Sequence, residues 1–329
     1  GRARLRERFE DFQVDEMLGF EPSAQGEHWL LRVRKCNANT GWVAADLARQ
    51  AGVRPFEVGY AGLKDRRAVT TQWFTVPARR GGVQDWAGRA GEGYEILEAH
   101  RHTRKLPRGA LAGNRFTLVL RGFTGSREAL ERRVAEIAVE GVPNYFGPQR
   151  FGRELGNLAV LRGEPVRGER GFAYSAARSL IFNAVLAERL AAGHWNRLLP
   201  GERANLEGSN STFRVEAIDE TLRQRLAALD IHPTGPLWGE GESGVTGEVA
   251  ELESSVASRY PALLELLRAD RLASARRPLR MVVRDLTLRW LHEADACELQ
   301  FSLRGGSFAT TVVRELVHLD DATGAEEHA

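Results

Sequence analysis

The sequence predicts a fold of mixed strands and helices, in which a sheet-based domain is interrupted by a mainly helical insertion. The first 170 of the 329 residues alternate short strand-like and helix-like patterns. A mainly helical block follows the Gly-rich stretch RGEPVRGERG, and strand patterns return only near Leu279. Strands separated by a run of helices are typical of α+β proteins. A chain of this length also favours two domains, because domains usually hold about 100 to 200 residues.

Residue periodicity predicts the elements of the first part. Residues 28–35 alternate apolar and basic side chains, with the period of a half-buried strand. Residues 40–50 have a helical pattern, which Thr40 can cap and Gly52 can end. Further patterns predict strands at residues 57–61, 72–76 and 116–120 and a helix at residues 126–141. Residues 63–71 are therefore expected to form a loop between two strands.

The second part is predicted to be mainly helical. Helical patterns cover residues 175–192, 219–229 and 249–272. The stretch IHPTGPLWGEGESGVTG between the last two has the Gly and Pro content of a loop. Apolar and polar residues then alternate from Cys297 to Leu303, which predicts a strand, and a capped helix is expected from Ser307 to Leu316.

Composition excludes several classes of protein. The chain is 43% hydrophobic and 27% charged, in the range of globular proteins. It has no apolar run near the roughly 18 residues that span a bilayer, and no apolar signal core follows its basic start. Cys36 and Cys297 lie far apart, so neither a disulfide framework nor a CxxC metal clip is expected. We therefore expect a cytoplasmic protein without membrane contact.

The cations of the chain are unevenly distributed, although the net charge is only +2. Residues 100–127 contain no Asp or Glu and seven cations: Arg101, Arg104, Lys105, Arg108, Arg115, Arg121 and Arg127. Such a local excess attracts a phosphate backbone. The alternative is a solvated basic face without a partner, and an Arg-rich coding bias would produce the same composition. Nucleic acid is the partner that this segment favours.

The most unusual local sequence is GYAGLKDRRAVTTQ, at residues 59–72. It sets one carboxylate, Asp65, among Lys64, Arg66 and Arg67 at the end of a predicted strand. Neighbouring cations favour an ionised carboxylate, which is competent as a nucleophile or base. From spacing alone, however, a charged hairpin turn in water is the more common explanation.

Two other segments combine aromatic residues with arginine. NYFGPQRFG, at residues 144–152, has the groups needed to stack an unpaired base and bond its edge. Alternatively, its two Phe residues anchor the core after a helix. RGGSFATTVVREL places Phe308 and Arg314 near a strand-to-helix turn, which fits an anion site or a simple helix start.

Other chemistries have little support in the sequence. His100 and His102 lack a third ligand at a metal-site spacing, so a basic loop is expected there rather than a zinc site. Neither a GxxxxGK[ST] nor a GxGxxG motif is present, so no nucleotide cofactor is expected.

Taken together, five segments resemble the tRNA pseudouridine synthase D (TruD) family, in this order and across almost the whole chain. They are EDFQVDEMLGFEPSAQGEHWLLRVRK, YAGLKDRRAVTTQ, NYFGPQRFG, SAARSLIFN and GSFATTVVREL. The resemblance implies an α+β core on a mixed, largely antiparallel sheet with flanking helices. It implies a catalytic domain at residues 1–169 and 282–329 and an inserted, mainly helical α/β domain at residues 170–281.

The resemblance also implies an activity: an isomerase that converts a uridine of tRNA, typically uridine 13, into pseudouridine. The exchange of the glycosidic bond from N1 to C5 involves no redox change and loses no group, so no cofactor is expected. The nucleotide must leave the base stack to react. Two alternatives are an RNA-binding or RNA-folding module with a vestigial site and a transferase that uses a small donor. The missing Gly-rich cofactor turn counts against the transferase.

Roles of single residues follow from the same resemblance. Asp65 is the expected nucleophile, and whether it attacks the ribose or the base stays open. Its expected basic partner is Arg6, slightly preferred over Arg314 and Lys64. The expected substrate-binding residues are Phe12, Lys64, Gln72, Asn144, Phe146, Arg150, Phe308 and Arg314, with Phe146 stacking the base. Arg101, Arg104, Lys105, Arg108 and Arg115 are expected to hold the RNA backbone. No metal ligands are expected, and nothing in the sequence demands an oligomer.

Overall fold

The computed structural model describes residues 1–79, 81–164, 170–269, 271–292 and 295–320, which form two compact units. The first unit comprises Gly1–Ala135, Val283–Ala309 and the residues from Val313 on, and the second comprises Glu136–Val282 and Thr310–Val312. Within the described residues, no helix is both long enough and apolar enough to cross a membrane.

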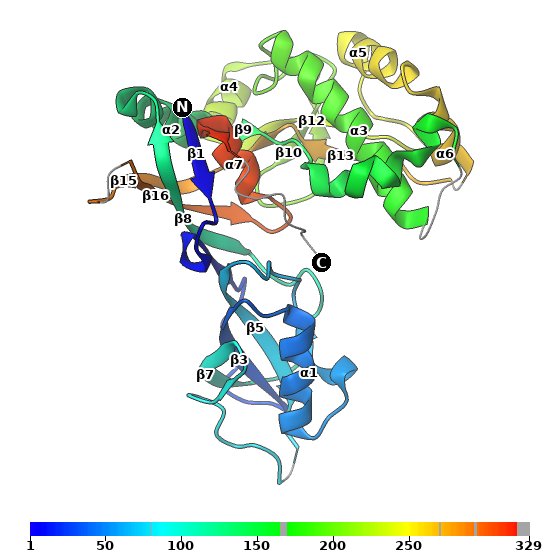
Figure 1. Cartoon of the computed structure of the whole chain (residues 1–329). Helices are drawn as coiled ribbons and strands as arrows, with labels where there is room; N and C mark the ends of the chain where they lie inside the picture. The colour runs from blue at the N-terminus through cyan, green and yellow to red at the C-terminus, as the bar shows by residue number, and fades with distance from the viewer. Residues whose placement is uncertain (80, 165–169, 270, 293–294, 321–329) are drawn as a thin grey trace. The chain divides into compact units, whose positions relative to one another are not determined.

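The first unit is built on one large sheet (Figure 1). Among the described residues its strands are β1 (Arg2–Leu5), β2 (Phe12–Met17), β3 (His28–Cys36), β4 (Gly59–Tyr60), β5 (Val69–Pro77), β6 (Ala90–Gly91), β7 (Tyr94–His102), β8 (Gly113–Thr124), β15 (Arg284–Trp290), β16 (Cys297–Arg304) and β17 (His318–Leu319). The strand order is β15-β16-β8-β2-β5-β3-β7-β6, with β1 beside β8 and β17 and with β4 beside β5. The pairs β2–β5 and β1–β17 are parallel, and the other pairs are antiparallel.

Helix α1 (Thr40–Ala51) lies along one face of this sheet, beside β3 and β5 (Figure 1). Val43 and Leu47 of the helix are fully buried against Phe74 and other apolar residues of the strands. The predicted end at Gly52 is confirmed, since that glycine adopts φ 66°. The predicted cap is wrong: Asn39 is the N-cap residue, and the Thr40 hydroxyl points inward to other partners.

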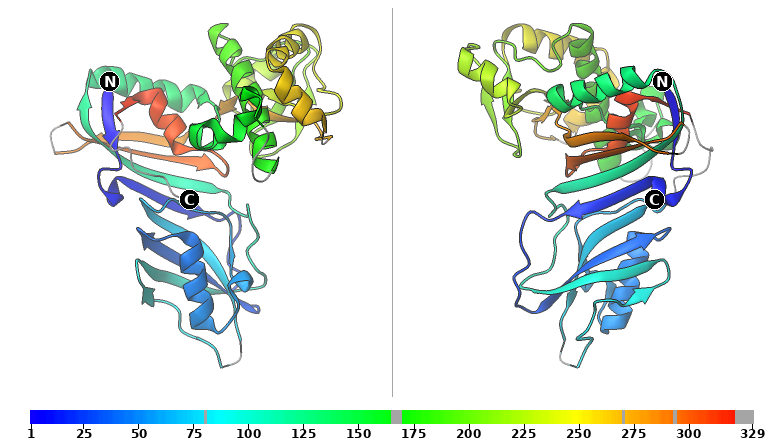
Figure 2. Two further views of the ribbon diagram at one scale, coloured as in Figure 1. Left: turned by 45° about the vertical axis from the view of Figure 1, so that its right-hand side comes forward. Right: turned by 90° about the vertical axis from the view of Figure 1, so that its left-hand side faces the viewer.

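Short 3-10 turns and two further helices complete this part of the chain. The turns are η1 (Phe9–Asp11) and η2 (Pro55–Glu57), and η2 replaces the start of the strand predicted at residues 57–61. Helix α2 (Arg127–Glu140) begins after Ser126, whose hydroxyl accepts a bond from the Ala129 N–H at 3.0 Å. Helix α7 (Ala309–Leu316) follows β16, and Figure 2 shows both helices beside the end of β8.

The second unit combines a smaller sheet with most of the remaining helices. Its four-stranded sheet has the order β11-β10-β12-β13, and β14 pairs with β9. The elements are β9 (Val142–Pro143), η3 (Pro148–Phe151), η4 (Arg153–Arg162), α3 (Arg170–Ala191), β10 (Arg203–Leu206), β11 (Thr212–Arg214), α4 (Glu220–Ala227), β12 (Ile231–Leu237), α5 (Gly247–Ser258), α6 (Pro261–Ala269), β13 (Ala275–Pro278) and β14 (Arg280–Met281). Its core packs α3 against β12 and helices α5 and α6.

Two sequence predictions fail in this unit. The stretch that begins IHPTGPL is a buried strand, β12, paired on both sides, and not a loop. Its Gly235 lets α3 approach closely, because a Cβ there would lie 3.0 Å from the ring of Phe182 and 2.8 Å from Leu279. The single helix predicted over residues 249–272 is two helices, since α5 ends before Pro261 begins α6.

The division into units differs from the expected domains at one end. The second unit ends at Val282, next to the predicted boundary, but begins at Glu136 rather than residue 170. Residues 142–164 belong to it because β9 pairs with β14, and because Phe151 packs into the core around α3. The predicted boundary at residue 169 falls in residues 165–169, outside the described part, and the domain limits stay a prediction.

Candidate active site

The Asp65 loop, residues 61–68 between β4 and β5, presents its carboxylate at the surface. The Asp65 side chain is 52% exposed, and its Oδ2 accepts a bond from Arg6 Nη2 at 2.5 Å. Arg6 follows β1 in a left-handed conformation, φ 65°, which is uncommon for a residue with a side chain. Its guanidinium lies 4.0 Å from the ring centre of Phe12. A carboxylate and a planar cation are thus held together at the edge of the sheet.

A buried lysine holds the backbone of the Asp65 loop from the inside. Lys35 of β3 is 1% exposed, and its ammonium donates to the carbonyl oxygens of Ala38 at 2.8 Å, Lys64 at 3.4 Å and Asp65 at 2.9 Å. The pKa of Lys35 is lowered to about 8, mainly by burial and also by the Lys64 charge, while the Asp65 charge opposes both. Lys35 therefore fixes the main chain at the residue whose side chain meets Arg6.

Lys64 and Gln72 point into the protein rather than outward. The Lys64 ammonium lies 2.7 Å from Glu16 Oε2, and both side chains are largely buried. Gln72 is fully buried; its amide accepts from the Thr40 hydroxyl at 2.9 Å and donates to the Gly62 carbonyl at 3.3 Å. The Thr40 hydroxyl also accepts a bond from the Lys64 N–H at 3.1 Å. These groups shape the loop, so their positions support a structural role.

The sequence reasoning missed three residues of this support: Lys35, Thr40 and Glu16. A lysine on the apolar face of a predicted strand was the available signal for Lys35, because burying an ammonium requires strong partners. Glu16 and Thr40 gave no signal of their own, since they reach the loop through strand pairing and helix placement.

Aromatic rings lie behind Arg6. Phe12 is 3% exposed and lies edge-on to Phe116 at 6.3 Å, and Phe116 stacks on Phe301 at 5.4 Å. The Arg6 guanidinium lies over the Phe12 ring. Phe12 thus supports Arg6 as a ring beneath a guanidinium.

Phe308 and Arg314 lie at the other end of the same unit's chain. Phe308 is the N-cap residue of α7 and is half-buried, and Arg314 is exposed on the last turn of that helix. Of the three candidate partners of Asp65, Arg6 is therefore the one that contacts its carboxylate.

Asn144, Phe146 and Arg150 belong to the second unit. The Asn144 amide donates to the Pro278 carbonyl at 2.8 Å and accepts from Arg277 Nη2 at 2.6 Å. Phe146 is only 6% exposed, with the Arg277 guanidinium 4.1 Å from its ring centre and the ring of Phe182 edge-on at 5.4 Å. A base that stacks directly on Phe146 requires the Arg277 side chain to move.

The five residues expected to hold RNA backbone lie on β7, β8 and the loop between them. Arg104, Lys105, Arg108 and Arg115 are exposed, and Arg101 is half-buried over Trp29. The Arg108 guanidinium lies 3.8 Å from the ring centre of Tyr60. The Gly109 N–H donates to the Ala61 carbonyl at 2.7 Å, which ties the basic loop to the start of the Asp65 loop.

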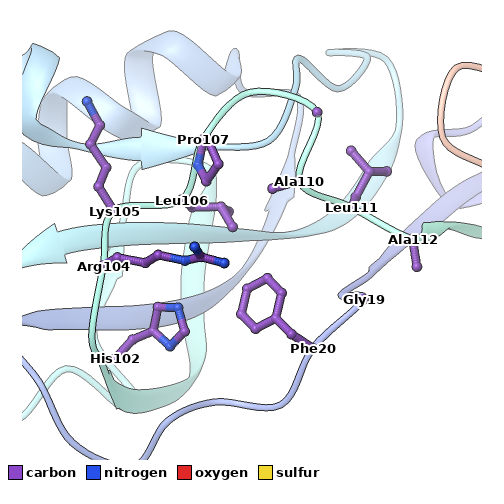
Figure 3. A pocket seen from close by; sticks show the side chains of 11 residues that line it. Gly19, Phe20, His102, Arg104, Lys105, Leu106, Pro107, Ala110, Leu111 and Ala112 are labelled. Carbon is purple, nitrogen blue, oxygen red and sulfur yellow. The ribbon is translucent and has the colours of Figure 1, made fainter.

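A pocket of about 250 Å³ lies on this basic loop (Figure 3). His102, Arg104 and Lys105 line one side, and Phe20 stacks on His102 with ring centres 5.1 Å apart. Burial lowers the pKa of His102, and Arg104 lowers it further, so its ring favours the neutral form. No group of three or more His, Cys, Asp or Glu able to hold a metal occurs in the residues that the structure describes.

Known proteins resemble this chain in sequence and in fold. A sequence model of the family described as "tRNA pseudouridine synthase D (TruD)" matches residues 2–167 and 172–316. The tRNA pseudouridine synthase D of Methylococcus capsulatus is 48% identical over 326 residues, which cover 97% of this chain and 92% of that protein. The chain belongs to the tRNA pseudouridine synthase D family. Membership makes it a pseudouridine synthase, an isomerase, as the resemblance of its motifs implied.

Two further tRNA pseudouridine synthase D comparisons extend this result. The protein of Nitrosococcus oceani is 47% identical, covering 98% of this chain and 92% of that protein. A crystal structure of the putative tRNA pseudouridine synthase D of Methanosarcina mazei superposes with a TM-score of 0.76 at 22% identity, covering 96% of this chain and 93% of that chain. This likeness confirms the predicted α+β fold.

Proposed function

We propose that this protein converts a uridine of tRNA, with uridine 13 as the expected position, into pseudouridine, and that Asp65 is its nucleophile. The observation that carries the proposal is the Arg6–Asp65 pair, in which a half-exposed carboxylate is bonded at 2.5 Å by a guanidinium. The named relatives, each a tRNA pseudouridine synthase D, supply the substrate class. Because tRNA is the proposed substrate, we place the activity in the cytoplasm.

The chemistry needs a positioned carboxylate and little else from the protein. The N1–C1′ bond of uridine breaks, the uracil turns, and a bond forms between C5 and C1′. The C5 proton leaves and N1 regains a hydrogen, so atoms and electrons balance without a second substrate. Asp65 attacks the ribose or the base, and both routes stay open. The expected absence of a cofactor follows from this balance.

Each of the residues around Asp65 has a separate role in this proposal. Arg6 orients the carboxylate, and Phe12 supports the Arg6 guanidinium from below. Lys35 fixes the Asp65 main chain through its carbonyl oxygen. Such preorganisation matters because a misplacement of about 1 Å in an active site costs roughly 10²-fold in rate.

Contacts with the rest of the tRNA are assigned to exposed cations. Arg104, Lys105 and Arg108 present positive charge on the loop that adjoins the Asp65 loop, and Arg115 does so at the start of β8. These side chains suit backbone phosphates, so tRNA affinity is expected to fall as salt rises. Phe308, at the start of α7, remains a proposed substrate contact.

Purified protein and a tRNA transcript test the proposal. Without any added donor or cofactor, uridine 13 should become pseudouridine, as measured by mass spectrometry of nuclease fragments. A transcript with cytidine at position 13 is the matched control and should remain unmodified. Modification at another uridine would overturn the position but not the activity.

Asp65→Asn tests the nucleophile. The amide is nearly isosteric but cannot attack, so activity should fall at least about 10³-fold while tRNA binding persists. If binding and activity fall in parallel, Asp65 has a structural role. If the unaltered protein forms no pseudouridine at stoichiometric amounts, the alternative of an RNA-binding module gains.

A further inference from the structure

Three arginines of the second unit bond only to uncharged groups. Arg150 donates to the Ser175 hydroxyl at 2.9 Å, Arg178 to the Leu237 carbonyl at 2.9 Å, and Arg277 to the Asn144 amide oxygen at 2.6 Å. Within the described residues, no carboxylate forms an ion pair with any of the three guanidiniums.

The same unit supplies carboxylates to two of its other buried arginines. Arg276, next to Arg277 on β13, lies 2.5 Å from Glu253, and Arg189 lies 3.2 Å from Glu202. Adjacent residues of a strand point to opposite faces, so Arg276 and Arg277 face different surroundings. One face pairs its arginine with an acid, and the other leaves Arg277 with a neutral partner.

Two of these arginines lie on Phe146. The Arg277 and Arg150 guanidiniums lie 4.1 and 5.1 Å from the centre of this ring. Ser175, which bonds Arg150, and Phe182, which contacts Phe146, lie two turns apart on α3. Arg178 lies between them in the sequence of α3, but its guanidinium donates to the carbonyls of Leu237 and Ala273 and does not contact Phe146 within the described residues.

This arrangement leaves positive charge uncompensated. Partial burial lowers the pKa of Arg150 and of Arg178. Burial, together with the charge of Arg150, lowers the pKa of Arg277 to about 10. The two guanidiniums on Phe146 therefore repel each other, and a bound anion relieves both the repulsion and the lost solvation.

We propose that Arg150 and Arg277 bind one phosphodiester group of the tRNA backbone, with Phe146 as the floor of the site. The planar fork of each guanidinium matches two phosphate oxygens, and the ring holds the Arg277 fork flat. The inference rests on the proposed function and assigns Phe146 to the support of arginine rather than to direct base stacking.

The salt dependence of tRNA binding tests the site without requiring turnover. Kd is measured against salt in the Asp65→Asn background for Arg150→Gln, Arg277→Gln and the double variant. Each single change should weaken binding about tenfold or more at low salt. Because both arginines hold one phosphate, the double variant should lose a slope of about 0.7 to 0.9 in log Kd against log salt, and not twice that. Activity is not measured, so a failed catalytic proposal leaves this result interpretable.

Controls separate the site from general charge and from folding. Arg223→Gln removes one positive charge from an exposed i,i+3 pair of the same unit and should leave the slope unchanged. Arg277→Lys should restore most of the slope. Arg150 is exposed, so its substitution tests the site even if Arg277→Gln unfolds the protein.

Two outcomes would overturn the inference. If Arg150→Gln and Arg277→Gln lower the melting temperature but leave the slope unchanged, the cluster is structural. If removing the 5′-phosphate of the transcript abolishes their effect, the ligand is a terminal phosphomonoester. Inorganic phosphate at millimolar concentration should raise the melting temperature less than tRNA does, since the site is proposed for a phosphodiester.

Discussion

The Asp65 loop and the Phe146 cluster, formed by Phe146, Arg150 and Arg277, differ in whether their arginine meets a carboxylate. In the first, Arg6 meets a half-exposed carboxylate at 2.5 Å while lying over the ring of Phe12. In the second, Arg277 lies over the ring of Phe146 at 4.1 Å and meets only an amide oxygen. The ring beneath the cation is common to both regions, and the anion is present in one.

The difference shows that an arginine placed over an aromatic ring can have two roles. A guanidinium fixed by an aromatic face is preorganised, so little entropy is lost when its fork forms bonds. Where the protein supplies the carboxylate, the pair orients a reacting group. Where it supplies none, the cation is left for an anion from solution. Substitutions at the two arginines should therefore differ in kind.

Of the substitutions that test this comparison, Arg6→Gln is expected to change the kinetics most. Loss of a charged bond to Asp65 should reduce kcat about 10- to 100-fold, because bonds to charged groups contribute about 1.5 to 3 kcal/mol. KM for tRNA should change little, whereas Arg277→Gln should act mainly on KM. Steady-state kinetics of both variants measure the split. If Arg6→Gln and Arg277→Gln change KM equally, the two regions do not differ in the way proposed. As a control, Arg6→Lys keeps the charge and should recover part of kcat.

A smaller effect, with a distinctive pH dependence, is expected from Lys35→Met. The variant loses three bonds to loop carbonyls, so kcat should fall about tenfold. In the unaltered protein, activity should decline as pH rises through about 8, because neutral Lys35 has only two N–H donors for three carbonyls. A rate profile from pH 6.5 to 9.5 in both proteins tests this, and the variant should lack that decline.

Stability should change in the opposite direction over the same pH range. The folded protein releases the Lys35 proton near pH 8, whereas the unfolded chain keeps it until about 10.5. The unfolded state thus binds more protons in this range, and the free energy of unfolding contributed by Lys35 rises with pH. The free energies of unfolding of the unaltered protein and of Lys35→Met, measured by denaturant melts at each pH, should therefore converge or cross as pH changes. Parallel curves would contradict the lowered pKa.

The smallest effect is expected from Phe146→Leu. Leucine fills much of the space but removes the cation–π contacts of Arg150 and Arg277, which are each worth about 0.5 to 1 kcal/mol. KM for tRNA should rise about two- to fivefold with a modest loss of thermal stability. A large fall in kcat instead would restore the role of Phe146 as a stacking platform for the reacting base.

Much of the first unit could be predicted from periodicity, and its motifs identified the family. Alternating residues from 28 to 35 predicted β3, and Gly52 marked the end of α1. The stretch around Gly235 failed because Pro and Gly normally mark loops, whereas the close approach of α3 explains the glycine in a strand. Such an approach is a long-range contact and leaves no local signature.

The candidate site was predictable in part. The family motif indicated Asp65 and the preferred partner Arg6, and the structure places these two in contact. The inward direction of Lys64 and Gln72 was not predictable, since the motif gives residue types but not the side of the chain on which each lies. Arg277 was missed because it lies within the inserted domain, where neighbouring arginines look alike in sequence.

The Asp65 loop is anchored from its inner side through Lys35, Thr40 and Gln72. Its outer edge carries Leu63, which is 68% exposed, and Arg66 and Arg67. Within this short segment, some groups bond to the inside of the protein, and other side chains face the solvent. A designer who wants a new RNA target can vary the outer positions while the inner ones keep the Asp65 carboxylate in place, which makes this loop a natural place to begin retargeting the enzyme.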